Sequence, residues 1–256
     1  MTFSTLFWNI WFHNQIKGEK ESQKLLSELK RLVDLYRPDY IGLNEVLRAS
    51  NSANPFIFDY LKNECGYEFG YFAASSQLND DWLIGSGFCS KNKPLAISSV
   101  PICRDVPAER RGYGGSTVKA ITVQIGLPGR NINVVVAHAL VLRPDTLIEH
   151  YRGTKVLENL VHSEEFSKNT ILGGDLNEPG FMPKAFKNTT KDTVHTRTGS
   201  TLDTTWRHGA RQKSLIRANL DQLYWSKHSD FILDTFEVID TNVSDHRPIF
   251  ARFQLS

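Results

Sequence analysis

Apolar and polar residues alternate along the chain in a pattern that predicts a mixed α/β protein. Phe3 to Ile10 is rich in aromatic and β-branched residues, which is typical of a buried strand. A polar stretch at residues 13–24 follows. From Leu25 to Tyr36 the apolar residues then recur with helical spacing, and Pro38 ends that helix. Residues 40–43 form a short second strand, so the chain begins with a strand–helix–strand unit of the kind found in layered α/β folds.

The rest of the chain contains short strand candidates and two more helices, with no internal repeat and no low-complexity linker. Residues 56–61 and 145–161 have helical periodicity, and a polar loop is expected at residues 48–54. The glycine- and proline-containing segment 126–130 predicts a hairpin turn. The remaining predicted strands are residues 67–73, 84–89, 95–100, 118–125, 132–137, 170–172, 220–225, 231–238 and 249–253. We expect several of them to be antiparallel and residues 1–256 to form a single domain.

Composition and charge exclude some classes of protein. The chain has no run of about 18 apolar residues, so we expect no membrane span. The apolar N-terminus lacks a basic region and a small-residue cleavage site, which favours a strand over a signal peptide. The net charge of +2 neither requires nor excludes a nucleic-acid substrate, so any binding of phosphate depends on local charge.

The cysteines indicate a reducing environment. Cys65, Cys89 and Cys103 are widely spaced and form no CxxC pair, so the prediction is three free thiols. One disulfide with a spare thiol is the alternative. We therefore expect a cytoplasmic protein that acts as a monomer.

Polar residues suited to catalysis lie at or just past the ends of the predicted strands. In layered α/β folds, strand ends at one edge of a sheet are where functional groups converge on a rigid scaffold. The sequence therefore predicts one composite site built from separate segments. Its candidate residues are Asn9, Glu45, His138, Asp175, Asn177, Asp221, Asp245 and His246.

The chemistry of this set fits phosphoryl transfer. Carboxylate and amide oxygens without a Cys/His cluster favour Mg²⁺, with Mn²⁺ as an alternative, over Zn²⁺. Two histidines, His138 and His246, are able to donate hydrogen bonds to a phosphate or to move protons. Hydrolysis of a phosphate ester needs a metal, a group that orients water and donors for the developing charge. The other histidines carry no motif and are expected at the surface: His13, His150, His162, His195 and His228.

Four short strings occur in an order that resembles the motif series of the endonuclease/exonuclease/phosphatase superfamily. They are Trp8-Asn9-Ile10, Leu43-Asn44-Glu45, Gly174-Asp175-Leu176-Asn177 and Ser244-Asp245-His246-Arg247-Pro248. This resemblance spans residues 7–250 and implies the deoxyribonuclease-I-like fold. That fold is an α/β protein with a four-layered sandwich, in which two central, mostly antiparallel sheets are flanked by helices.

The resemblance also implies a metal site. Glu45 matches the principal metal ligand of the family, Asn9 lies beside it, and Asp245 matches a carboxylate at or near the metal. The family usually has Gln before the metal-binding Glu, where this chain has Asn44. The shorter amide leaves Glu45 in place as a ligand and is expected to shift its surroundings.

The remaining motif residues resemble catalytic groups. Asp175 matches the residue that activates the attacking water, and Asn177 the one that hydrogen-bonds the phosphate. His246 matches the histidine at the scissile phosphate, with Asp221 as its orienting acid. His138 matches a histidine that stabilises the phosphate or protonates the leaving group, although Ala137 precedes it where Thr or Ser is usual.

These observations predict a divalent-metal-dependent hydrolase of phosphate esters, with a nuclease or DNA-repair phosphodiesterase as the first choice. The substrate would then be a nucleic acid. A phosphatase or phosphodiesterase for phospholipid or inositol phosphate head groups is the alternative, and a non-catalytic binding module on the same fold is a third reading. Two further segments are expected to be loops, with contact to the substrate as the alternative. They are the glycine-rich residues 110–115 and the basic residues Arg207, His208, Arg211, Lys213 and Arg217.

Overall fold

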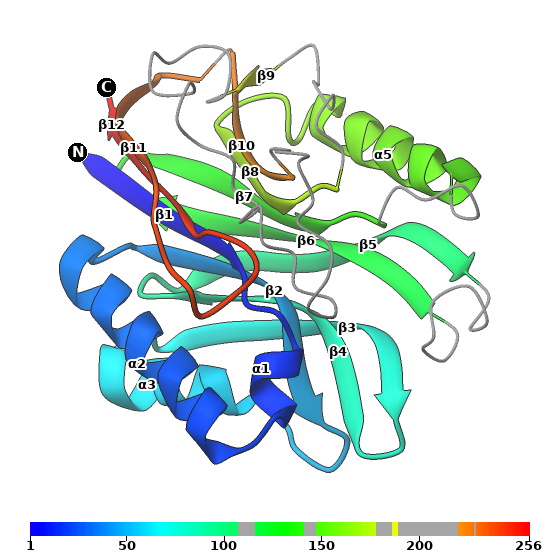
Figure 1. Cartoon of the computed structure of the whole chain (residues 1–256). Coiled ribbons are helices and arrows are strands. Elements are labelled where there is room, and N and C mark those ends of the chain that lie inside the picture. The colour runs from blue at the N-terminus through cyan, green and yellow to red at the C-terminus, as the bar shows by residue number, and fades with distance from the viewer. Residues whose placement is uncertain (107–115, 141–146, 178–185, 189–219, 228) are drawn as a thin grey trace.

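Two six-stranded sheets pack face to face at the centre of the molecule in the computed structural model (Figure 1). The structure describes residues 1–106, 116–140, 147–177, 186–188, 220–227 and 229–256. The first sheet has the order β11-β12-β1-β2-β4-β3, with β11 Phe231–Val238, β12 Ile249–Leu255, β1 Thr2–Asn9, β2 Tyr40–Ala49, β4 Trp82–Ser90 and β3 Phe69–Asn79. The second has the order β5-β6-β7-β8-β10-β9, with β5 Pro94–Val106, β6 Ser116–Leu127, β7 Arg130–His138, β8 Thr170–Asp175, β10 Asp221–Ser226 and β9 Phe186–Asn188.

Helices cover the outer faces of both sheets and complete four layers, as predicted. The described helices are α1 His13–Ile16, α2 Glu19–Tyr36, α3 Phe56–Cys65 and α5 Leu147–His162. Helices α2 and α3 pack on the first sheet, and α5 packs on the second (Figure 1). Within the described residues, no helix is both long and apolar enough to cross a membrane.

Most strand pairs are antiparallel, with two parallel exceptions. Strands β1 and β2 are parallel and are joined through α2, which confirms the predicted strand–helix–strand unit. Strands β7 and β8 are also parallel and are joined through α5. A parallel pair brings the carboxyl ends of both strands to the same edge of its sheet. In each sheet, two strand ends therefore meet at one edge.

Strand β1 is buried on both faces from Phe3 onward. Phe3 and Phe7 point between the sheets, whereas Leu6 and Trp8 point toward the helices. Successive side chains of a strand alternate between faces, so a strand in the middle layer of a sandwich carries large apolar residues on both faces. This explains why apolar residues in β1 do not simply alternate with polar ones.

The sheets approach closely where the ring of Phe7 lies over two glycines. A Cβ on Gly42 in β2 or on Gly173 in β8 would overlap this ring. Phe7 is 1% exposed and has no room to move aside, because protein interiors are close-packed. The absent side chains at these two positions therefore set the spacing between the sheets.

The sequence pattern missed some elements because their residues are polar. Residues 13–24 contain α1 and the beginning of α2, whose first residues lie toward solvent and break the apolar spacing. Strand β2 continues to Ala49 instead of ending at residue 43, so the loop predicted from residue 48 begins later. The short strand β9 was not predicted.

His150 lies in the core, so the predicted surface position was wrong. It is 1% exposed, and its Nδ1 lies 2.6 Å from the carbonyl oxygen of Leu140. Residues 150, 153, 154, 157 and 161 form the buried face of α5 with i, i+3, i+4 spacing. A histidine outside any motif suggests a surface position, but residue 150 lies on the face of α5 that packs against the sheet. The three cysteines are free thiols, as predicted.

We expect Gly173→Ala to destabilise the protein by about 1–3 kcal/mol, because the added methyl group overpacks the core against Phe7. The free energy of unfolding would be measured by urea denaturation. Gly126→Ala is the matched control, since its Cβ would meet only the exposed side chain of Leu95. Equal stability of the two variants would contradict the proposed role of Gly173 in sheet spacing.

Candidate active site

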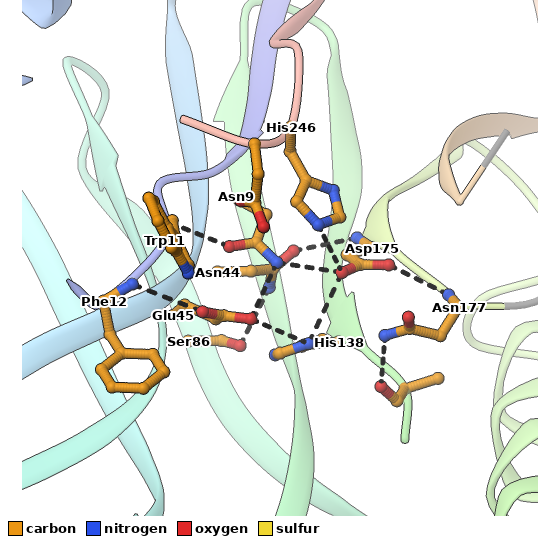
Figure 2. A network of polar contacts seen from close by, with 12 residues as sticks. Asn9, Trp11, Phe12, Asn44, Glu45, Ser86, His138, Asp175, Asn177 and His246 are labelled. Carbon is orange, nitrogen blue, oxygen red and sulfur yellow. Dashed lines mark hydrogen bonds and ion pairs between the residues drawn. The ribbon is translucent and has the colours of Figure 1, made fainter. Parts of the chain in front are cut away.

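The structure brings the eight candidate residues together at one edge of the two sheets. Figure 2 shows the part of this site formed by Asn9, Glu45, His138, Asp175, Asn177 and His246. The eight residues come from five strands, from the turn after β8 and from the segment that precedes β12. Register explains much of this. Strands β7 and β8 pair His138 with Asp175, and the antiparallel start of β10 pairs Asp221 with Asp175 from the other side. Asp175 therefore stands at the centre of the second sheet's contribution.

The side-chain amide of Asn9 connects carboxylates from both sheets. Its Nδ2 donates to Glu45 Oε1 at 3.2 Å and to Asp175 Oδ2 at 2.9 Å. Its Oδ1 accepts the backbone N–H of Trp11 at 3.1 Å. In this arrangement Asn9 presents its nitrogen to the carboxylates, so its amide holds the acidic groups in place and its oxygen is already used.

Glu45 lies within β2, not beyond its end. The strand passes through an irregularity between Leu43 and Val46 in its pairing with β4, and Glu45 has a φ of 56°. Its Oε2 accepts the backbone N–H of Phe12 at 3.3 Å. Left-handed backbone at a residue other than glycine is uncommon and tends to occur at functional sites.

Asn44 links the two sheets beside the site. Its Oδ1 accepts the backbone N–H of Asp175 at 2.9 Å, and its Nδ2 donates to Ser86 Oγ at 2.9 Å. The neighbouring Gly174 has a φ of 133°, and a Cβ there would overlap the carbonyl oxygen of Ala137. Position 174 therefore needs glycine, since a side chain there would prevent the backbone N–H of Asp175 from reaching Asn44 Oδ1.

His246 and Asp221 form a buried pair. Asp221 Oδ2 lies 2.6 Å from His246 Nδ1, which leaves Nε2 directed toward Asp175 Oδ2 at 3.7 Å. Burial alone would lower the pKa of His246. The charges of Asp221 and Asp175, with the hydrogen bond to Asp221, outweigh it and raise the pKa well above its usual value. The acidic neighbours therefore favour the protonated form of the ring.

Ser244 and Trp8 hold the histidine segment against β1. Ser244 Oγ donates to the carbonyl oxygen of Asn9 at 2.7 Å and accepts the backbone N–H of His246 at 3.2 Å. Trp8 Nε1 donates to the carbonyl oxygen of His246 at 3.0 Å. The sequence motifs contained both residues but gave no sign of these bonds.

His138 and Asn177 complete the arrangement around Asp175. His138 Nε2 lies 3.6 Å from Asp175 Oδ2 and 4.0 Å from Glu45 Oε1, and its side chain is 24% exposed. Asn177 donates its backbone N–H to Asp175 Oδ1 at 3.0 Å and its Nδ2 to the carbonyl oxygen of Ala139 at 3.0 Å. Asp175 is thus held from both oxygens.

Negative charge accumulates on the Glu45 side of the site. Burial, with the nearby charges of Glu45 and Asp175, raises the pKa of Asp245 to about 6, against the opposing effect of the His246 charge. Carboxylates placed this close favour a bound cation, and an all-oxygen set suits a hard divalent ion. Glu45 and Asp245 therefore fit Mg²⁺ or Mn²⁺.

A second grouping also offers candidate ligand atoms. Ligand atoms of Asp175, Asp221 and His246 lie within 4.8 Å of one another. Within this grouping, the 2.6 Å contact between His246 Nδ1 and Asp221 Oδ2 is already a hydrogen bond. The glycine-rich residues 110–115 and the basic residues between 207 and 217 lie outside the described part of the chain.

Comparison with known proteins places these features in a family context. The sequence profile described as "Endonuclease/Exonuclease/phosphatase family" matches residues 6–246. An endonuclease/exonuclease/phosphatase family protein from Leptotrichia buccalis superposes with a TM-score of 0.75 at 16% identity, over 99% of this chain and 100% of that chain. No curated protein matches the sequence.

Two further solved structures share the fold. TDP2 from D. rerio, complexed with a single-strand DNA product, has a TM-score of 0.67 at 15% identity, over 99% of both chains. The human nocturnin catalytic domain with a bound sulfate anion has a TM-score of 0.67 at 17% identity, over 100% of this chain and 94% of that chain. At these identities the likeness concerns the fold.

We expect Asp245→Asn to stabilise the metal-free protein at pH 7.5, because it removes a carboxylate that ionises unfavourably beside Glu45 and Asp175. The folded-state pKa of about 6 lies above the ordinary value of 3.8, so the folded form binds more protons between these values. Wild-type stability should therefore fall as the pH rises through this window.

Thermal unfolding at several pH values with EDTA checks this prediction. The difference in Tm between Asp245→Asn and wild type should grow from pH 4 to pH 7. Asp80→Asn, at an exposed position, is the control and should show no such growth. A constant difference across the range would show that Asp245 is not under charge repulsion.

Proposed function

Because the chain belongs to the endonuclease/exonuclease/phosphatase family, we propose that it is a divalent-metal-dependent hydrolase that cleaves phosphodiesters. The observation that carries this proposal is the convergence on Asp175. Its Oδ2 is bonded to Asn9 and lies within 3.7 Å of the Nε2 atoms of both His138 and His246. We also propose that residues 1–256 act as one domain, since both sheets contribute to this site.

The metal would be held on the Glu45 side. Glu45 and Asp245 would supply carboxylate oxygens to Mg²⁺ or Mn²⁺, and Asn9 would keep Glu45 in position through its amide nitrogen. When bound, the ion supplies positive charge to nonbridging phosphate oxygens. A cation would also offset the carboxylates, because burial and the charges of Glu45 and Asp175 raise the pKa of Asp245.

Asp175 would orient the attacking water and take its proton. Its carboxylate is fixed by a backbone N–H of Asn177 on Oδ1 and by the Asn9 amide on Oδ2. A base that is already held in position loses little entropy when the water binds. The side chain is 2% exposed, so bulk water does not compete for these bonds.

The two histidines would act on the phosphate. Asp221 keeps His246 charged and fixes its ring, so that Nε2 is free to donate toward a phosphoryl oxygen as charge develops. His138 is the more exposed of the two and lies next to both Glu45 and Asp175. It would donate to the phosphate or protonate the leaving group.

We propose a nucleic-acid diester as the substrate, in a nuclease or a DNA-repair phosphodiesterase. Two points support this choice: the family name covers nucleases, and the same fold in D. rerio TDP2 holds a single-strand DNA product. Phospholipid and inositol phosphate head groups are the competing substrates, and a panel of substrates distinguishes them.

We expect EDTA to abolish hydrolysis of bis-p-nitrophenyl phosphate, and Mg²⁺ or Mn²⁺ to restore it. Asp175→Asn and His246→Gln should each lower kcat by about 10²–10⁴-fold, which is the range for a positioned acid or base. His162→Gln, on α5 and away from these groups, is the control and should keep full activity. Wild-type rates in Asp175→Asn would refute the assignment.

A substrate panel tests the second part of the proposal. Single-stranded DNA, abasic-site duplex, 5′-tyrosyl DNA, RNA, sphingomyelin and inositol polyphosphates would be compared at equal concentration with Mg²⁺. We expect a nucleic-acid diester to give the highest kcat/KM. Preference for a lipid or inositol phosphate would keep the hydrolase and reject the nuclease.

A further inference from the structure

Strand β2 loses its neighbour at the point where it presents Glu45. Strand β1 pairs with β2 only as far as Asn9 and Asn44, and Ile10 N–H adds a last bond to the carbonyl oxygen of Asn44. Beyond this point none of the described strands lies beside that edge of β2. Glu45 also has a left-handed backbone, which a β-strand does not itself stabilise.

The side chain of Gln15 in α1 occupies the place that β1 leaves. Its Nε2 donates to the carbonyl oxygen of Glu45 at 2.8 Å, and its Oε1 accepts the backbone N–H of Leu47 at 2.9 Å. A primary amide has one donor and one acceptor side, as a strand does, so it is able to replace a short piece of ladder. Gln15 is 6% exposed, which shields both bonds from water.

The neighbouring Asn14 makes a comparable bond to the other metal-side segment. Its Nδ2 donates to the carbonyl oxygen of Val243, directly before the segment that carries Asp245. Helix α1 thus contacts both segments that supply the proposed metal carboxylates. Gln15 makes two of these bonds, one to the carbonyl oxygen of Glu45 itself and one to the N–H of Leu47, so it holds the backbone at Glu45 and just beyond it.

We propose that Gln15 is a positioning residue that sets the metal affinity of the site by fixing the backbone of Glu45. This inference rests on the proposed function, because it assigns Glu45 to the metal. Without the amide, the irregular part of β2 would lose both bonds on that edge, and the Glu45 carboxylate would sample more orientations. Groups that orient a metal ligand typically change metal affinity by about 10–100-fold.

The test is a titration of Gln15→Met with Mn²⁺, in which electron paramagnetic resonance measures the concentration of free Mn²⁺. Methionine has a similar length and is able to fill the buried space, but it neither donates to Glu45 nor accepts from Leu47. We expect the Kd for Mn²⁺ to rise about tenfold. The Mn²⁺ concentration for half-maximal activity should rise in parallel, with kcat at saturating Mn²⁺ changed far less.

Gln77→Met is the matched control, since Gln77 is exposed on β3 and the same substitution there should leave the Kd unchanged. A purely structural role for Gln15 would lower the Tm of the metal-free protein and leave the Kd of the folded fraction at its wild-type value. That result would overturn the inference. A wild-type protein that binds no Mn²⁺ would instead contradict the proposed function.

A second variant covers the case in which Gln15→Met does not fold. Gln15→Asn keeps the amide but is one methylene shorter, so it is unable to reach both backbone groups at once. We expect it to fold, as judged by circular dichroism, and to raise the Kd for Mn²⁺ by about threefold, less than the tenfold typical of a fully lost orienting partner. Wild-type affinity in Gln15→Asn would overturn the inference in the same way.

Discussion

The close contact between the two sheets is the constraint on which the rest of the structure depends. The ring of Phe7 in β1 lies over Gly42 of its own sheet and Gly173 of the other, so one side chain fills the space between the sheets at that point. One consequence is a hydrogen bond of 2.9 Å from the Asp175 backbone of one sheet to the Asn44 side chain of the other. Because the site takes its residues from both sheets, a change in this spacing would separate its parts.

Placing several carboxylates at this edge has an electrostatic cost, which the fold offsets with nearby donors. The Asn9 amide bridges Glu45 and Asp175, and the contact of Asp221 with His246 favours the protonated form of that ring. These donors do not fully offset the unfavourable ionisation of the carboxylates, because burial and neighbouring charge still raise the pKa of Asp245 to about 6. A divalent cation would supply the charge that offsets these carboxylates, which supports the proposal of a metal-dependent reaction.

Much of the fold was predictable because strands buried on both faces leave a continuous apolar signature. Residues 132–137 were predicted as a strand and form the buried part of β7, and the parallel pairing of β1 with β2 follows from the helix between them. Polar elements were not predictable in this way. The side chain of Gln15 in α1 is hydrogen-bonded to β2, and the end of β2 pairs with β4. Neither interaction can be recognised from the spacing of apolar residues in the sequence.

The sequence by itself determined the chemical inventory of the site and its placement at strand ends, because motif order and strand pattern are local properties of the chain. Only the tertiary structure decided how these groups are bonded. It turned the Asn9 nitrogen toward the carboxylates, paired Asn44 with Asp175, and placed Gln15 and Ser244 behind the candidate residues. Each of these bonds joins distant segments, and its existence depends on distances that only the packing of the two sheets sets.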